Sequence, residues 1–293
     1  MNSLVKSVQF QLTTSCNERC IFCRKYTWKK RELPIEIIEK KMNKYKNAFY
    51  QFSGGEPTMY SNLSMLNKLL EGKKYKVYTN GVVDLANEEV LKFLDNAVEI
   101  AISFDACNSK TYNKVRRPLD DFAFYKVIAT ATRYSTKSKL SMVVTSENIE
   151  EIPGILITAD SIGIKTRFYP IHTNTDGLIP SKKQVEDLKK ELENMEFDKE
   201  LTNVFGIFDV GFFDTKRDFI PCKARKYSRL IDEQGREYFC CYAINDNGMD
   251  IDGVNSIDKL KYFDTTTMYG YCDHCTRYRN FNENEVEPGP KFM

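Results

Sequence analysis

Short β-type runs alternate with amphipathic helical patterns over roughly the first two thirds of the chain. Apolar residues recur at helical spacing after Pro34, as Ile35, Ile38 and Met42 illustrate. Strand–helix alternation with short connections predicts βαβ units and a parallel sheet. The runs that predict strands, rich in β-branched and aromatic residues, are 7–12, 48–52, 75–79, 98–104, 139–144 and 164–170.

The helical patterns have recognisable ends. Ser61 is the expected N-cap of one helix, and Gly72 lies just past its last turn. Six strand–helix units are two fewer than a closed eight-stranded barrel needs, so an open doubly wound sheet and an incomplete barrel both fit. In either fold, ligands collect at the carboxyl ends of the strands. The other helical patterns cover roughly 87–96, 120–135, 149–161 and 181–195.

The alternation ends near residue 205. Residues 227–241 are typical of a hairpin, with two β-rich runs around the turn from Asp232 to Gly235. A loop rich in Gly and Asp follows at 245–254, and a short helical pattern lies near 256–262. We therefore expect two domains, an α/β domain over 1–205 and a small domain over 206–293.

Charge and hydropathy narrow the function classes. Lys and Arg number 43 against 41 Asp and Glu, a net charge of +2, which gives no electrostatic case for a nucleic-acid or anionic-membrane partner. The first residues lack the apolar core of a signal peptide, and no run of about eighteen apolar residues occurs. These features predict a cytoplasmic protein.

The chain has nine cysteines, and their clustering indicates metal binding. An odd count in a large chain fits a disulfide framework poorly. Cys16, Cys20 and Cys23 form a CxxxCxxC group directly after the first predicted strand, a spacing with which thiolates can wrap one face of an iron–sulfur cluster. The alternatives are a zinc ion with a distant fourth ligand and incidental buried cysteines.

This CxxxCxxC group, with Phe22 just before its last cysteine, resembles the signature of the radical S-adenosylmethionine (SAM) enzymes. In that family three cysteines hold a [4Fe–4S] cluster, and the fourth iron binds the amino and carboxylate groups of SAM. The resemblance implies that an external one-electron reductant of the flavodoxin or ferredoxin type supplies the electron that cleaves SAM. The resulting 5′-deoxyadenosyl radical takes a hydrogen atom from the substrate. A partial (β/α)6 barrel is the implied fold.

Four later motifs follow predicted strands in order and resemble family elements: GGEP, TNG, an S-x-D element and a polar residue after the fifth strand. The two glycines let the backbone approach the amino group of SAM. Ala106 and Arg117 stand where the family usually has glycine. The resemblance assigns SAM binding to Gly54, Gly55, Glu56, Pro57, Asn80, Ser103, Asp105 and Asn148.

A second set of cysteines lies in the last quarter of the chain. Gly235 precedes Cys240 by the spacing found in the Twitch domain, a shortened SPASM extension in which four cysteines hold one auxiliary [4Fe–4S] cluster. The resemblance therefore implies two [4Fe–4S] clusters beside SAM. A zinc ribbon is the alternative, since four cysteines also suit zinc. The implied ligands are Cys222, Cys240, Cys272 and Cys275.

Two reaction outcomes fit these residues. In the first, the substrate radical passes an electron to the auxiliary cluster, giving dehydrogenation or a new bond, as in Twitch enzymes that oxidise an aminocyclitol alcohol. In the second, Cys241, on the strand face opposite Cys240, donates a hydrogen atom and inverts a stereocentre, as in radical SAM epimerases of peptides and aminoglycosides. A non-catalytic iron–sulfur electron carrier is the alternative from another class.

The position of the first cysteine bears on the substrate. With Cys16 so near the start, we expect no leader-binding domain before the barrel, which favours a small polar or sugar-like substrate over a peptide. Arg167, His172 and Asp176 lie at or after the sixth predicted strand and are candidate substrate contacts. Cys107 is expected to be a small buried residue without a role in catalysis.

Overall fold

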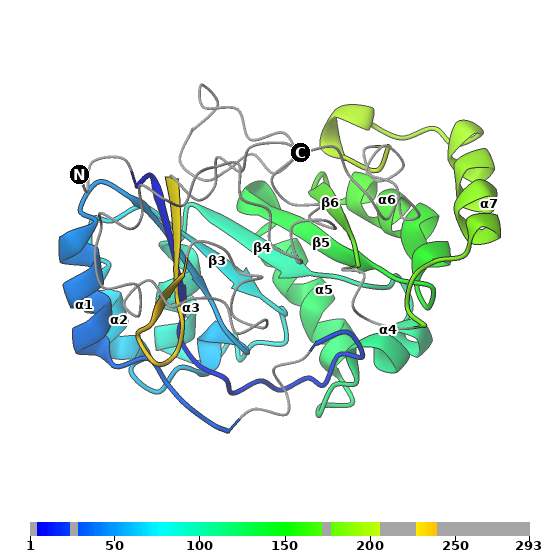
Figure 1. Ribbon diagram of the computed structural model, residues 1–293. Helices are drawn as coiled ribbons and strands as arrows, with labels where there is room; N and C mark the ends of the chain where they lie inside the picture. Colours follow the sequence, from blue (N-terminus) through cyan, green and yellow to red (C-terminus); the bar gives the residue numbers. More distant parts are fainter. Residues whose placement is uncertain (1–4, 24–28, 172–176, 206–226, 239–293) are drawn as a thin grey trace.

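The computed structural model describes residues 5–23, 29–171, 177–205 and 227–238, which form one α/β unit around an eight-stranded sheet (Figure 1). The strand order is β6-β5-β4-β3-β2-β1-β7-β8, and every neighbouring pair is parallel except β7 with β8. The predicted parallel sheet is confirmed, and each of the six predicted strands is found. The strands are β1 Ser7–Gln11, β2 Phe49–Ser53, β3 Tyr75–Thr79, β4 Glu99–Ser103, β5 Ser138–Val144, β6 Lys165–Pro170, β7 Ser228–Ile231 and β8 Glu237–Tyr238.

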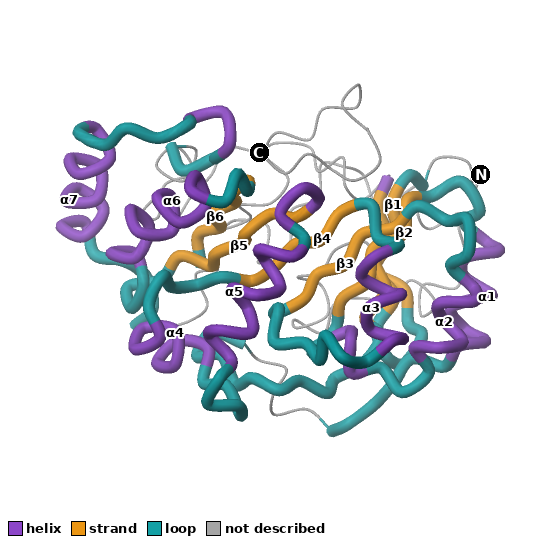
Figure 2. Tube along the Cα trace, turned by 180° about the vertical axis from the view of Figure 1, so that it is seen from behind, coloured by secondary structure: helices purple, strands orange, loops and turns teal. Residues whose placement is uncertain are grey.

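Helices connect the strands and cover one face of the sheet; α3, α5 and α6 lie in front of the strands in Figure 2. The cap predicted at Ser61 is wrong, because the N-cap residue is Asn62 and Ser61 instead hydrogen-bonds to the Glu32 carboxylate. The helix α4 was not predicted. The helices are α1 Ile35–Lys44, α2 Leu63–Leu69, α3 Glu88–Asp95, α4 Ser109–Arg116, α5 Ala123–Arg133, α6 Ile152–Ser161 and α7 Lys182–Glu193, with short 3-10 turns η3 Pro57–Met59, η4 Ser135–Lys137, η5 Ile149–Glu151 and η6 Lys199–Leu201.

The two faces of the sheet differ in chemistry because side chains alternate along each strand. Residues such as Phe10, Phe52 and Ile102 are fully buried in a core shared with the helices, and we call this the outer face. The opposite, inner face is polar, as hydrogen bonds from Gln9 to Ser53 at 2.8 Å illustrate. Its polar residues are Ser7, Gln9, Gln11, Gln51, Ser53, Lys76, Tyr78, Glu99, Ser103, Lys139, Ser141, Lys165, Arg167 and Tyr169.

The predicted hairpin around residues 232–235 is present, and it extends the main sheet. Its first strand, β7, pairs in parallel with β1, so β1 lies between β2 and β7. The buried Asp232 carboxylate closes the turn by accepting from the backbone N–H groups of Gln234 and Arg236 at 3.0 and 2.8 Å. The hairpin that we assigned to the small domain is therefore hydrogen-bonded to the sheet of the larger one.

An ion-pair cluster fastens this hairpin to α1. The Glu237 carboxylate is almost fully buried and accepts from Lys41 at 2.9 Å and Lys44 at 3.0 Å, and from the Tyr45 hydroxyl. Burial alone would raise the pKa of Glu237, but hydrogen bonds from Tyr45 and Lys41 and the charges of the two lysines bring it below its usual value. The hairpin is thus held by buried charge pairing as well as by strand pairing.

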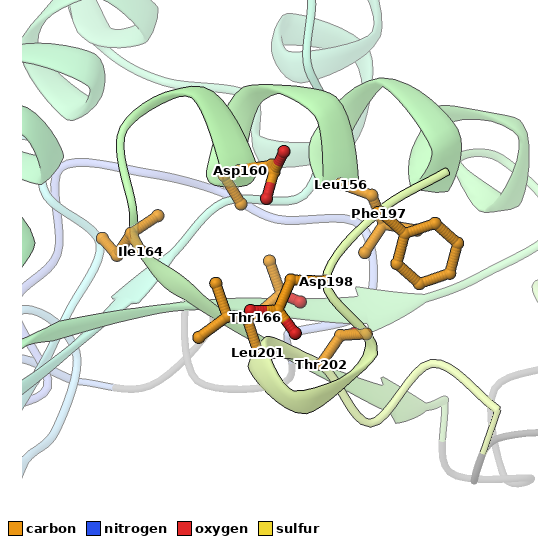
Figure 3. Close-up of a pocket in the computed structure, with 9 residues that line it drawn as sticks. Leu156, Asp160, Ile164, Thr166, Phe197, Asp198, Leu201 and Thr202 are labelled. Carbon is orange, nitrogen blue, oxygen red and sulfur yellow. The ribbon is translucent and has the colours of Figure 1, made fainter. Parts of the chain in front are cut away.

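A small hollow lies on the outer side of β6, between α6 and the η6 turn (Figure 3). Leu156 and Phe197 form its apolar wall, and Asp160 and Asp198 lie at its rim. It lies on the face of the sheet opposite the polar inner residues, so it is separate from the site described below. Within the described ranges, every helix is too short or too polar to cross a lipid bilayer.

Candidate functional site

The cysteine loop begins where β1 ends and is bound on both sides. Leu33 N donates to Leu12 O at 2.8 Å, and Thr14 Oγ1 donates to Lys29 O at 2.8 Å, which holds the two sides of the loop together. Further along, Ile21 N donates to Val115 O in α4 at 2.9 Å. The loop therefore stands at the carboxyl edge of the sheet, where parallel sheets place their ligand sites.

The two glycines after β2 are required by close packing against this loop. Gly55 N donates to Thr13 O at 2.6 Å, and a Cβ atom on Gly55 would lie 2.2 Å from Ser15 O. A Cβ atom on Gly54, which has φ +149°, would lie 2.5 Å from Thr13 O. Only glycine fits at either position, because the obstructing atoms belong to the backbone. The predicted GGEP motif thus packs directly against the cysteine loop.

Glu56 joins the ends of β2 and β3 from a fully buried position. Its carboxylate accepts from the Thr79 hydroxyl at 2.8 Å, from Asn80 N at 2.7 Å, and from the Thr58 backbone N–H at 3.1 Å and hydroxyl at 2.8 Å. Burial raises the pKa of Glu56 against the lowering effect of these hydrogen bonds. Glu56 therefore acts as an internal brace that fixes the GGEP and TNG loops relative to each other.

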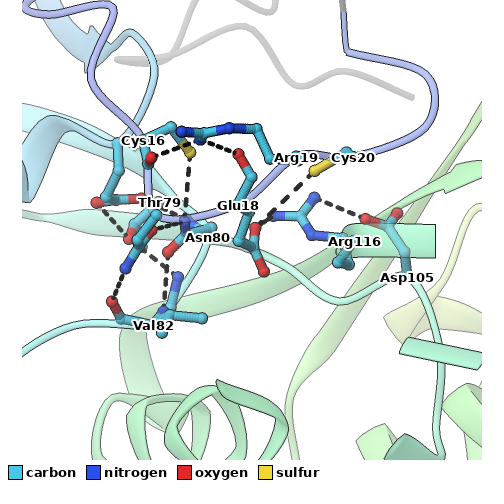
Figure 4. Close-up of polar contacts among 12 residues, drawn as sticks. Cys16, Glu18, Arg19, Cys20, Thr79, Asn80, Val82, Asp105 and Arg116 are labelled. Carbon is cyan, nitrogen blue, oxygen red and sulfur yellow. Dashed lines mark hydrogen bonds and ion pairs between the residues drawn. The ribbon is translucent and has the colours of Figure 1, made fainter. Parts of the chain in front are cut away.

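Asn80 links this brace to the cysteine loop (Figure 4). Its side-chain amide lies 3.7 Å from Cys16 Sγ and donates to Asn17 Oδ1 at 2.6 Å. Its amide oxygen accepts from Val82 N at 2.9 Å, which fixes the orientation of the group. An N–H group directed at a cluster-binding sulfur is one of the means by which proteins adjust iron–sulfur potentials.

A buried charged network, which the sequence did not reveal, supports the other side of the loop (Figure 4). Arg116, at the end of α4, pairs with Asp105 at 2.8 Å and with Glu18, which lies between two of the loop cysteines. Tyr112 donates to Glu18 at 2.6 Å, and the Cys20 thiol lies 3.9 Å from the same carboxylate. All three charged side chains are at most 7% exposed. The sequence analysis assigned no role to Glu18, although an acidic residue between the cysteines of a CxxxCxxC group is a feature that could have drawn attention to it.

Several predicted SAM contacts are buried beneath the site. Asp105 also accepts from Val143 N at 2.7 Å, and the Asn148 amide donates to the Asp105 and Val143 carbonyls at 3.0 Å each. Gly54, Gly55 and Ser103 stay partly exposed, whereas the other five predicted contacts are buried. In the structure, the polar groups of Asp105 and Asn148 hydrogen-bond to other residues of the chain, and their contact with SAM stays a prediction.

The two positions where glycine is usual in the family behave differently. Arg117 adopts a left-handed backbone, with φ 47° and ψ 59°, at the C-cap of α4. This conformation favours glycine and costs about 1 kcal/mol for another residue. Ala106 has no positive φ and is fully buried, so alanine fits there without backbone strain.

The three loop cysteines are free thiols suited to a cluster rather than to one ion. Burial, aided by the nearby Glu56 charge, raises the pKa of Cys16 to about 11, and burial raises that of Cys20 as well. In the described part of the chain, no three His, Cys, Asp or Glu side chains converge enough to hold a single metal ion. A zinc ion needs thiolates about 4 Å apart, whereas each thiolate of a four-iron cluster binds its own iron. Three free thiols in one loop are a donor set that can hold a [4Fe–4S] cluster, and their role as its ligands stays a prediction.

Other predicted site residues fall outside the described residues, and these assignments stay predictions. Arg167 is described and lies on the inner face of β6, while Cys107 hydrogen-bonds to Glu151 at 2.9 Å. The predicted residues outside the described ranges are Cys222, Cys240, Cys241, Cys272, Cys275, His172 and Asp176.

A parallel α/β sheet with three free thiols after β1, braced by Gly-Gly-Glu after β2, defines the class of protein. The chain belongs to the radical SAM superfamily, whose family model matches residues 10–159. Among curated proteins, it is 30% identical over 168 residues to an S-adenosylmethionine-dependent nucleotide dehydratase of Flammeovirga pacifica, covering 51% of this chain and 57% of that protein. It is 25% identical over 190 residues to a probable GTP 3′,8-cyclase of Methanopyrus kandleri, covering 60% of each. The chain spans about half the length of the curated relatives it matches.

Solved structures share the fold at low sequence identity. Streptococcus suis SuiB bound to its precursor peptide SuiA superimposes with a TM-score of 0.67 and 16% identity, covering 98% of this chain and 74% of SuiB. The enzyme anSMEcpe with bound AdoMet and a peptide gives a TM-score of 0.63 and 17% identity, covering 92% and 86% of the two chains. These likenesses show the fold alone, an α/β fold with the parallel sheet typical of a partial radical SAM barrel.

Proposed function

We propose that this chain binds a [4Fe–4S] cluster through Cys16, Cys20 and Cys23, together with SAM, and acts on a small polar or sugar-like substrate. The single observation that carries the proposal is the packing of the GGEP loop against the cysteine loop, where a Cβ atom on Gly55 would clash with Ser15 O. When bound, the reduced cluster supplies the electron that cleaves SAM to methionine and a 5′-deoxyadenosyl radical, which removes a hydrogen atom from the substrate.

The residues of the chain hold and orient these groups. The partly exposed backbone of Gly54 and Gly55 offers carbonyls to the amino group of SAM, and Glu56 fixes that backbone from behind. Ser103, at the end of β4 on the inner face, is the partly exposed side chain through which we expect the chain to contact the rest of SAM. The polar inner face below it would receive the substrate.

The finer reaction class rests on the second cysteine set. We propose that Cys222, Cys240, Cys272 and Cys275 hold an auxiliary [4Fe–4S] cluster that accepts an electron from the substrate radical, giving dehydrogenation or bond formation. A small substrate is supported by the relative from Flammeovirga pacifica, a nucleotide dehydratase, because a nucleotide carries a sugar. The alternative outcome is epimerisation, with Cys241 as the hydrogen-atom donor.

The first test measures SAM cleavage. Anaerobic reconstitution of the full chain should give about eight irons, and reduction with dithionite should release 5′-deoxyadenosine from SAM. Cys20→Ala should lose the release, because its thiolate is one of three ligands. Cys107→Ala is the matched control and should retain both iron and SAM cleavage, because the Cys107 thiol donates to Glu151 and is not one of the proposed cluster ligands. A fully iron-loaded chain that never cleaves SAM would be an electron carrier and would contradict the proposal.

The second test separates the two outcomes. Candidate aminocyclitols and nucleotides are incubated with reduced enzyme and SAM in deuterated buffer. A product that has lost two hydrogens indicates oxidation through the auxiliary cluster, whereas carbon-bound deuterium indicates quenching by an exchangeable thiol. If Cys241→Ala removes the deuterated product and still forms 5′-deoxyadenosine, the epimerase alternative replaces the dehydrogenase.

A further inference from the structure

The inner face of the sheet carries a row of cations that runs from β3 to β6. Lys76, Lys139 and Arg167 all have strand neighbours in the apolar core, so their own side chains lie on the opposite, inner face. The strand register places Lys76 opposite Glu99. Among the described inner-face positions of β1 to β6, Glu99 is the single residue with a carboxylate. With the exposed Lys165 opposite Lys139, four positive charges meet one negative charge on the described inner face of β1 to β6, and three of the four belong to this row.

Glu99 is already shared between two of the cations. Its Oε1 atom lies 2.5 Å from Lys76 Nζ, and its Oε2 atom lies 2.7 Å from Lys139 Nζ. Arg167 donates through Nη1 to the carbonyl of Thr166 at 2.9 Å, and its buried Nε atom has no hydrogen-bond partner among the residues that the structure describes. Among the described residues, Glu99 balances one of the charges of Lys76, Lys139 and Arg167, which leaves an excess of two positive charges over these four side chains.

The cost of burial differs between the two lysines: burial works to lower the pKa of Lys76, but Tyr78, whose ring centroid lies 4.5 Å from Nζ, and Glu99 raise it overall, so the uncompensated charge is at Lys139 and Arg167. The Lys76 side chain is only 6% exposed, and that of Lys139 only 21%. Burial and the neighbouring charges of Lys76 and Arg167 lower the pKa of Lys139, despite its hydrogen bond to Glu99. Partly buried cations that lack counter-charge are stabilised when an anion binds among them, and a phosphate group carries about the two negative charges that are missing here.

The two lysines lie deeper in the sheet than the expected position of SAM, whereas Arg167 lies level with Ser103, because both are in register with Ser141. Lys139 lies opposite Ala101, two residues before β4 ends at Ser103, and Lys76 lies opposite Glu99, further from the carboxyl edge. The predicted SAM contacts gather at that edge, around Gly54 and Ser103. An anion bound between Lys76 and Lys139 would lie below SAM, in the space that the substrate of such an enzyme occupies.

We propose that Lys76, Lys139 and Arg167 form a binding site for a phosphate group of the substrate, which makes the substrate a phosphorylated small molecule. This inference rests on the proposed function, and it names the substrate class of that same site. Lys76 and Lys139 act as point charges, and Arg167 offers its guanidinium fork. Glu99 holds the two lysine ammonium groups in place and limits how much anionic charge the site accepts.

The test is calorimetric titration of the reconstituted, SAM-saturated chain with inorganic pyrophosphate at low ionic strength. Lys139→Gln and Arg167→Gln should each weaken pyrophosphate binding by about tenfold or more, because each removes a charged hydrogen-bond donor. Glu99→Gln should tighten binding, since it removes the competing carboxylate. Lys183→Gln is the matched control, because Lys183 is an exposed helix lysine whose side chain is 83% exposed. The Lys183→Gln variant should bind pyrophosphate with the same affinity as the chain without substitutions.

Three results would overturn the inference: no pyrophosphate binding, equal binding by Arg167→Gln and Lys183→Gln, or competition between pyrophosphate and SAM. Competition would mean that the cations hold the carboxylate of SAM instead. The assay also separates this inference from the proposed function, because 5′-deoxyadenosine release is measured on the same preparation. A chain that binds pyrophosphate through Lys139 and Arg167 but never cleaves SAM would retain this site and lose the proposed enzymatic role.

Discussion

The buried pairing of Arg116 with two carboxylates yields the sharpest prediction about the cysteine loop. Arg116→Met removes the cation and keeps most of the volume, leaving Glu18 and Asp105 buried without their counter-ion. Removing one partner of a buried ion pair typically costs about 3–5 kcal/mol. Two other contacts limit the loss, because Tyr112 still donates to Glu18 and Val143 N still donates to Asp105. We therefore expect a cost near the lower value, about 3 kcal/mol.

The substitution should also disturb the loop that holds Cys16, Cys20 and Cys23, because this loop is hydrogen-bonded to α4. Arg19 N donates to Arg116 O at 3.0 Å, and Ile21 N donates to Val115 O at 2.9 Å. Urea denaturation followed by circular dichroism should show a midpoint lower by about 1 M or more, given typical slopes of about 1–3 kcal/mol per molar. Iron content after reconstitution should fall as well, because the loop loses its support.

Arg133→Met provides the matched control. Arg133 is about half exposed and lies 3.9 Å from Asp95, so its loss should leave the urea midpoint nearly unchanged. Adding Glu18→Gln and Asp105→Asn to Arg116→Met should recover much of the stability, since no unpaired charge then stays buried. If Arg116→Met and Arg133→Met had the same urea midpoint, the reasoning from buried charge would be refuted.

Three further predictions concern other positions. Gly55→Ala should lower the free energy of unfolding by about 1–3 kcal/mol and reduce iron binding. Its control is Gly163→Ala, because Gly163 has φ +65° and open space around it. Gly163→Ala should lower the free energy of unfolding by about 1 kcal/mol and leave the iron content unchanged. Arg117→Gly should raise the free energy of unfolding by up to about 1 kcal/mol, because φ is 47°. The unchanged protein should have a larger free energy of unfolding than Glu237→Gln. This difference should be fully present above about pH 4.3 and shrink at lower pH.

These outcomes are checked by chemical and thermal unfolding and by iron analysis of the same variants. The sign for Glu237 follows from its lowered pKa in the folded chain: the group stabilises where it is ionised and loses that effect as the pH falls through the folded value. An unchanged iron content in Gly55→Ala would mean that the cysteine loop tolerates displacement. A destabilised Arg117→Gly would show that the Arg117 side chain outweighs its backbone strain.

The sequence predicted the strands well because each combines a compact apolar run with flanking turn residues. It missed α4 because 109–116 is mostly polar, although Asn108 at its N-cap and the spacing of Tyr112, Val115 and Arg116 carry a helical signal. The network of Arg116 with Glu18 could not be predicted, since the two residues are 98 positions apart and no periodic pattern links them. The GGEP and TNG motifs predicted the location of the site, but not that Glu56 braces it internally.

The pairing of β7 with β1 could not be predicted from the sequence either, because the hydrophobic pattern of a strand does not reveal which strands lie beside it. It has a practical consequence for dissecting this protein. A fragment ending before Ser228 would leave the whole length of β1 unpaired on one side, exposing a row of backbone donors and acceptors to other molecules. Within the part of the chain that the structure describes, the edge of the sheet on this side is instead the two-residue β8. Trimming the chain where its repeating strand–helix units stop would therefore yield a product prone to self-association, with the cysteine loop attached to the exposed strand.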